Sequence, residues 1–168
     1  MKEIIMAETL SVTDMLPNKF EPKRDYRWVL AIEGIDSFLV AATKRPSISI
    51  GNSQIKFINS YRQISNGKGV FGGISVELHD PIAPSGAQQV MEWIRTHYES
   101  VSGRSGYTDF LKRDLQLKML DPIGTVVELW DIKGALITSA DFGSLSYDND
   151  GIMKISLNLE VDNCVLQF

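Results

Sequence analysis

The sequence predicts a mainly β fold of the α+β class: an antiparallel β-sandwich or rolled β-barrel with one packed α-helix. Three observations predict it. Several segments alternate apolar and polar residues with the period of two that marks a half-buried strand. One segment, residues 85–98, has the period of an amphipathic helix. Strand and helix patterns do not alternate along the chain, which argues against a parallel α/β sheet.

Residues 1–22 read as an N-terminal arm that precedes a single β domain of residues 23–168. Apolar residues such as Leu10, Met15 and Leu16 are scattered among polar ones, and two prolines punctuate the end of the segment. We expect either an arm that docks on a neighbouring subunit or a short helix that covers its own domain.

The first strands are expected at Tyr26–Ile32 and Phe38–Ala42. Residues Gly34–Asp36 form a plausible turn between them, so the two strands are predicted to pair as a hairpin. Residues 46–50 are then expected to be extended.

Residues 51–73 are rich in Gly, Asn and Ser but also contain Ile55, Phe57, Ile58, Tyr61 and Ile64. This content is better suited to a protruding loop or hairpin with a partner than to a free linker. Ile74–His79 follows as a clearly alternating strand.

One helix is expected after Ser85, which has the capping-box spacing to Gln88. An apolar stripe follows at helical spacing, and a stretch rich in Gly and Ser ends the helix. The members of the stripe are Val90, Trp93, Ile94, His97 and Tyr98.

The C-terminal part predicts three strands. Leu115–Met119 alternates, Asp121–Gly124 forms a turn, and Thr125–Lys133 is a long strand after which Gly134 begins a connection. A turn at Asp148–Gly151 precedes the most regular strand, Ile155–Val161.

Length and charge limit the function. The 168 residues suit one domain, and the net charge of −4 argues against tight nucleic-acid binding, which relies on phosphate neutralisation. The single cysteine, Cys164, permits no internal disulfide and is interpreted as an inert thiol. The opening residues fit neither a signal peptide nor a membrane span, so we expect a protein that is cytoplasmic at synthesis.

The sequence offers no convincing catalytic, cofactor-binding or metal-binding residues. Gly67–Gly72 fits G-x-G-x-x-G but precedes a strand, whereas a nucleotide fingerprint must open a helix. His79 and His97 fall on different elements without a cysteine cluster, and Asp148–Gly151 lacks the downstream glutamate of a calcium loop. We therefore expect no cofactor and a protein that is not an enzyme.

The order of these features is similar to a known family. The segments that carry the similarity are Tyr26–Ala42, Lys56–Asn59, Ile64–Gly67 with Val70–Phe71, Gln88–Trp93, Asp131–Gly134 and Ile155–Val161. In this order and spacing the chain resembles the tube proteins of contractile, myovirus-type bacteriophage tails, which have relatives in other contractile injection systems.

The resemblance implies a structural virion protein. Hexameric rings, in which each subunit completes a shared inner β-barrel, would stack into a tube for DNA ejection inside a contractile sheath. The implied partners are further copies of the chain, the tail sheath protein, and the baseplate hub or initiator and tail terminator proteins. DNA would pass through the lumen without specific binding, and the acidic balance would keep it from sticking. The implied location is the virion tail, assembled in the host cytoplasm.

The candidate contacts between subunits or rings come from the protruding segment and the arm. They are Lys56, Phe57, Asn59, Tyr61, Arg62, Ile64, Asn66 and Phe71, together with Leu10, Met15 and Leu16. Two alternatives stay open: a baseplate tube initiator or tube cap, and a monomeric ligand-binding β-sandwich.

Overall fold

The computed structural model describes Met15 and residues 20–168. The remainder of the expected N-terminal arm lies outside the described residues. The strands are β1 (Trp28–Ile32), β2 (Val40–Thr43), β3 (Ile48–Phe57), β4 (Ser60–Phe71), β5 (Ile74–His79), β6 (Arg113–Leu120), β7 (Val126–Asp141), β8 (Lys154–Glu160) and β9 (Asn163–Leu166). The helices are α2 (Gly86–Arg95) and α3 (Thr108–Leu111), and a short 3₁₀ turn, η1, covers Ser37–Leu39.

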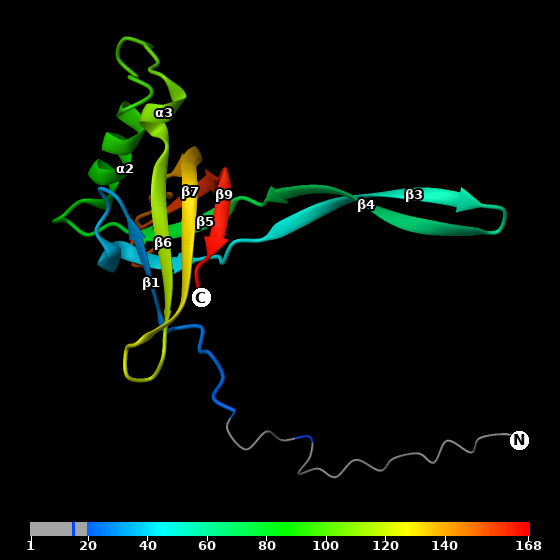
Figure 1. Ribbon diagram of the computed structural model, residues 1–168. Helices are drawn as coiled ribbons and strands as arrows, with labels where there is room; N and C mark the ends of the chain where they lie inside the picture. Colours follow the sequence, from blue (N-terminus) through cyan, green and yellow to red (C-terminus); the bar gives the residue numbers. More distant parts are fainter. Residues whose placement is uncertain (1–14, 16–19) are drawn as a thin grey trace, which may run out of the picture.

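Seven strands form one antiparallel sheet that folds over on itself (Figure 1). Its order is β1-β6-β7-β8-β5-β2, and β9 also pairs with β7. β7 belongs to two halves, because residues 126–135 pair with β6 and residues 136–141 pair with β8. The mainly antiparallel β fold with a packed helix is confirmed.

The two halves enclose one hydrophobic core. Leu30, Leu115 and Leu117 from the β1-β6-β7-β9 half join Val76 and Leu157 from the β2-β5-β8-β7 half in a single buried cluster. Alternation along β8 is complete, since Ile155, Leu157 and Leu159 are buried and the residues between them are exposed. The strand expected at Ile155–Val161 is confirmed.

The expected end of the long strand at Lys133 is wrong, because β7 continues to Asp141. Gly134 has a φ of +66°, which a glycine adopts readily, and the register with β6 shifts between the Arg113 and Leu115 pairs. A bulge of this kind bends a strand without ending it. Here it lets β7 pass from one half of the sheet to the other.

The expected hairpin of the first two strands is also wrong. β1 pairs with β6, and β2 pairs with β5 in the other half of the sheet. Between them η1 redirects the chain, and the only link across the turn is a single bridge between Ile32 and Ile35 among the described residues. A turn signal fixes a change of direction but not which strands pair.

The helix is confirmed as α2, but it ends at Arg95, so His97 and Tyr98 of the expected stripe lie beyond it. Ser85 is its N-cap, and its hydroxyl accepts a hydrogen bond from the Gln88 amide at 3.4 Å. Val90 and Trp93 are fully buried, and the Trp93 indole Nε1 donates to the carbonyl oxygen of Leu111 at 2.5 Å. That bond ties α2 to α3, a four-residue helix that the sequence did not predict because one turn has no measurable period.

Candidate assembly surfaces

The segment Ile48–Phe71 is a long β-hairpin that forms a two-stranded sheet of its own. Figure 1 shows it extending from the side of the molecule away from α2. Every residue of β3 is exposed, and in β4 only Phe71 is partly buried. An isolated two-stranded hairpin is at best marginally stable in water, so this one indicates a partner.

The register divides the outer part of the hairpin into two faces. Pairing of Ser53 with Ile64, Ile55 with Arg62 and Phe57 with Ser60 places these six side chains on one face. The opposite face is polar apart from Tyr61. Its members are Asn52, Gln54, Lys56, Tyr61, Gln63 and Ser65.

The apolar side of the hairpin changes near the body. Three residues of β4, Asn66–Lys68, lie opposite the single residue Gly51, and this irregularity interrupts the ladder. A Cβ at Gly51 would lie 2.5 Å from the Asn66 side-chain nitrogen, so a larger residue there would displace the Asn66 side chain. Below it, Ile48 and Ile50 occupy the face opposite to that of Ile55.

The hairpin brings together some of the predicted contact residues and separates others. Phe57, Arg62 and Ile64 share the apolar face, whereas Lys56 and Tyr61 are paired on the polar face. The remaining candidates lie elsewhere: Asn59 in the terminal turn, Asn66 at the irregularity, Phe71 at the base against the core, and Met15 exposed. Leu10 and Leu16 lie outside the described residues.

Two exposed apolar residues of the outer part of the hairpin are missing from the predicted set. Ile55 stands next to Phe57 on the apolar face, and alternation along the segment could have identified it. Ile58 lies in the terminal turn with a φ of +40°, a conformation that costs a β-branched residue of order 1–3 kcal/mol. Its side chain is fully exposed, which no sequence pattern indicates.

The half-sheet β2-β5-β8-β7 ends in two strand edges. β2 pairs on one side with β5, and residues 136–141 of β7 pair on one side with β8, in the part of the chain that the structure describes. Because all its pairings are antiparallel, the two edge strands run in opposite directions. β2 of one molecule can therefore pair antiparallel with β7 of another.

The outer face of this half-sheet carries small polar side chains. Asn158 Nδ2 donates to Ser139 Oγ at 2.8 Å, and Lys154 lies 3.5 Å from Glu77. One row consists of Ser75, Asn158 and Ser139, the next of Glu77, Ser156 and Asp141, and His79 pairs with Lys154 beyond them. This surface is polar rather than apolar.

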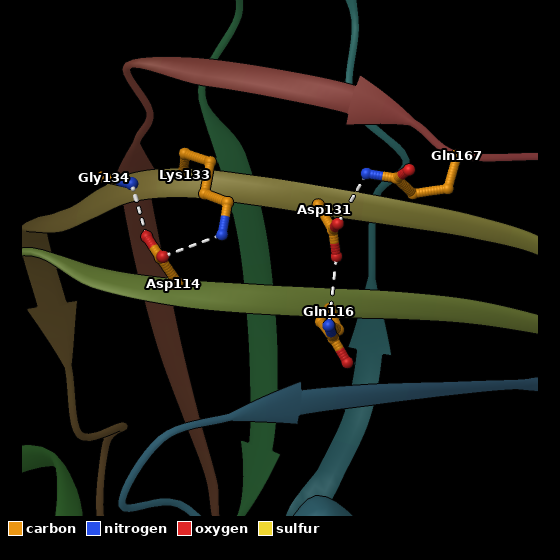
Figure 2. Close-up of polar contacts among 6 residues, drawn as sticks. All are labelled: Asp114, Gln116, Asp131, Lys133, Gly134 and Gln167. Carbon is orange, nitrogen blue, oxygen red and sulfur yellow. Dashed lines mark hydrogen bonds and ion pairs between the residues drawn. The ribbon is translucent and has the colours of Figure 1, made fainter.

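The other half-sheet carries a polar network on its outer face (Figure 2). Asp131 accepts hydrogen bonds from Gln116 at 3.1 Å and from Gln167 at 2.7 Å, which connects β6, β7 and the C-terminal segment. Asp114 accepts from the Gly134 amide at 3.1 Å and from Lys133 at 3.0 Å. The hydrogen bonds from the Gly134 amide and from the Lys133 ammonium group hold the pKa of Asp114 below its ordinary value.

Glu128 is the one charged residue buried among the described residues. It accepts hydrogen bonds from Lys23 and from the Trp130 indole, and Arg45 lies 3.7 Å away. Burial raises the pKa of Glu128, but the bonds from Lys23 and Trp130 outweigh it and leave the pKa below its ordinary value. The carboxylate thus joins β7 to the chain that follows the N-terminal arm and to the linker that leads into the hairpin.

No family model matches the sequence, and no curated protein matches it. Solved structures do match. A chain of the anti-feeding prophage cap, described as the tube terminating cap, aligns with a TM-score of 0.71 at 16% identity, over 94% of this chain and 99% of that one. A chain of the sheath/tube terminator of the extracellular contractile injection system PVC gives 0.70 at 15% identity, over 89% and 99%.

A chain of the PVC sheath-tube complex gives a TM-score of 0.68 at 15% identity, over 95% of this chain and 99% of that one. The chain has the fold of tube-related components of contractile injection systems. The similarity spans nearly the whole length of each matched chain, so the projecting hairpin and the rolled sheet belong to one shared architecture. The family resemblance drawn from the sequence is confirmed in the fold.

Proposed function

We propose that this protein is a structural, non-catalytic subunit of a contractile tail, and that it builds the inner tube by stacking of hexameric rings. The observation that carries the proposal is the near-complete overlap with a chain of a sheath-tube complex, combined with a hairpin that projects from the molecule. A hairpin exposed on both faces is explained by contacts between copies.

Ring formation is supported by the two edges of the β2-β5-β8-β7 half-sheet. Pairing of β2 with β7 of the next copy is a head-to-tail contact. Repeated contacts of this kind close into a ring when a whole number of equal rotations between copies makes a full turn. Such closure also removes strand edges that invite uncontrolled pairing. In the ring, the four-stranded half-sheets would form one continuous inner barrel.

In this arrangement the small polar face of the half-sheet lines the lumen. Serine and asparagine side chains make the wall hydrophilic, and the carboxylates of Glu77, Asp141 and Glu160 lie on strands of this half-sheet. A weakly acidic wall repels the phosphates of passing DNA. The contractile sheath surrounds the tube, and the baseplate and the tail terminator bind its two ends.

Negative-stain electron microscopy and sedimentation of the purified protein test this function. We expect rings or tubes of uniform bore at high concentration. Deletion of residues 56–66 should leave a folded monomer that does not polymerise. A protein that stays monomeric at all concentrations, with or without the cognate baseplate, would favour a ligand-binding β-sandwich instead.

A second function, a tube-capping or baseplate ring, is favoured by the matches to a terminating cap and to a chain of a baseplate structure with a TM-score of 0.67. The two roles differ in elongation. A cap or initiator forms single rings that bind one end of a tube, whereas the main subunit adds ring upon ring. Measuring tube length against protein concentration separates them.

A further inference from the structure

The hairpin differs in charge from the rest of the molecule. Residues 48–71 contain Lys56, Arg62 and Lys68 and no aspartate or glutamate, although the whole chain has a net charge of −4. The chain outside the hairpin is therefore more acidic than the whole. A partner that complements the hairpin must be acidic and must also cover the apolar residues Ile55, Phe57 and Ile64.

The loop between β7 and β8, residues 142–153, has both properties. It contains Asp148 and Asp150 and no lysine or arginine. Leu145, Tyr147 and Ile152 are 86%, 110% and 79% exposed, and Leu145, Ser146 and Tyr147 line a shallow hollow of about 330 Å³. Large apolar side chains displayed in this way on an acidic loop mark an interaction surface.

The loop has a defined shape. The Asp148 amide donates to the Ser146 hydroxyl at 3.2 Å, and the Gly151 amide donates to the Asn149 side chain at 3.0 Å. These local bonds fold the backbone into consecutive turns. Tyr147 lies within these turns, and Leu145 and Ile152 flank them on either side.

We propose that the outer half of the hairpin, residues 52–65, docks on the 142–153 loop of a second copy of this chain. The inference rests on the proposed self-assembly and specifies its contact. Arg62 lies among the apolar residues of the docking face, so that Ile55, Phe57 and Ile64 meet Leu145, Tyr147 and Ile152 while Arg62 meets Asp148 or Asp150.

A second apolar segment is a poorer match for the hairpin. Val101, Tyr107 and Phe110, around α3, are also exposed. Acidic and basic residues are mixed there, however, with Arg104 and Lys112 beside Glu99 and Asp109. Such a segment offers no net charge to attract the basic hairpin.

Disulfide crosslinking between copies tests the contact. Full-length protein with Phe57→Cys is mixed with full-length protein with Tyr147→Cys under assembly conditions and then oxidised. We expect a covalent dimer that requires both variants. Tyr61→Cys, on the opposite face of the hairpin, is the matched control and should give at least tenfold less dimer, as should Val101→Cys in place of Tyr147→Cys.

A charge exchange gives a second readout. Arg62→Asp should lower the sedimenting fraction at least tenfold, and Asp148→Arg together with Asp150→Arg should do the same. Mixing or combining the reversed partners should restore assembly. Rings or tubes that form without the 57–147 crosslink would overturn this contact but keep the proposed function, whereas absence of both assembly and crosslink would overturn the two together.

Discussion

Glu128 on β7 forms an ion pair with Lys23, which lies 105 residues earlier in the chain. The glutamate side chain is 8% exposed, while that of Lys23 is 49% exposed, so the pair is buried at one end only. Arg45, on the short linker between β2 and β3, lies near the other carboxylate oxygen. One buried group therefore anchors both the chain around Lys23 and the linker that leads into the hairpin.

Replacing Glu128 with Gln should destabilise the fold by about 1–3 kcal/mol, because the charge that satisfies Lys23, Arg45 and the Trp130 indole is lost. Urea unfolding measures the change. Glu160→Gln, at an exposed position of β8, is the matched control and should stay within about 0.5 kcal/mol of the unmodified protein. Equal effects of the two substitutions would show that Glu128 anchors nothing.

The same carboxylate predicts a pH dependence. Its pKa in the folded protein lies below the ordinary value of 4.5, so its contribution to stability is fully present above pH 4.5 and is lost as the pH falls through the folded-state pKa. The stability difference between the unmodified protein and Glu128→Gln should therefore be constant from pH 7 to about 5 and should shrink below pH 4.5. A difference that grows on acidification would contradict the assignment.

Trp93 links α2 to the chain that leads into β6. Trp93→Phe removes the hydrogen bond to the Leu111 carbonyl and leaves that oxygen unpaired, and it weakens the stacking of Arg113, whose guanidinium carbon lies 4.7 Å from the ring centroid. We expect a loss of about 2–4 kcal/mol in the free energy of unfolding. Thermal unfolding measures it, and Tyr107→Phe at an exposed position should change little.

Local patterns of the sequence predicted local structure well. The Ser85 cap, the buried Trp93 and the alternation of β8 each depend on residues within a few positions of one another. The pairing of β1 with β6 and the passage of β7 through Gly134 depend on contacts between distant segments. For that reason the turn at Gly34 predicts a hairpin that does not form, and Gly134 predicts a strand end where β7 continues.

The candidate surface shows the same division. Composition alone indicated a protruding segment at residues 51–73, but the sorting of Phe57 and Tyr61 onto opposite faces follows from the register across the hairpin. The apolar side also changes near Gly51, because Ile48 and Ile50 stand at even positions of β3 whereas Ile55 and Phe57 stand at odd positions. A residue list without the register mixes contacts that face different neighbours.

The two faces of the hairpin should contribute unequally to assembly. The double substitution of Ile55→Ser and Ile64→Ser removes apolar area from one face and should strongly lower the sedimenting fraction, while Gln54→Ser and Gln63→Ser on the other face should have little effect. Because all four side chains are exposed in the monomer, its stability should change by less than about 0.5 kcal/mol in both variants. Equal loss of assembly from both faces would refute the asymmetry.

The proposed lumen wall makes a prediction about DNA. If the outer face of the β2-β5-β8-β7 half-sheet lines the bore, Asp141→Lys together with Glu160→Lys turns two repelling charges per subunit into attracting ones. Assembled tubes should then retain double-stranded DNA in a co-sedimentation assay at low salt, release it as salt is raised, and slow DNA ejection in a complete tail. Asp131→Lys and Asp114→Lys, on the outer face of the other half-sheet, form the matched control. If the control pair slows ejection and the first pair does not, the assignment of the lumen face must be reversed.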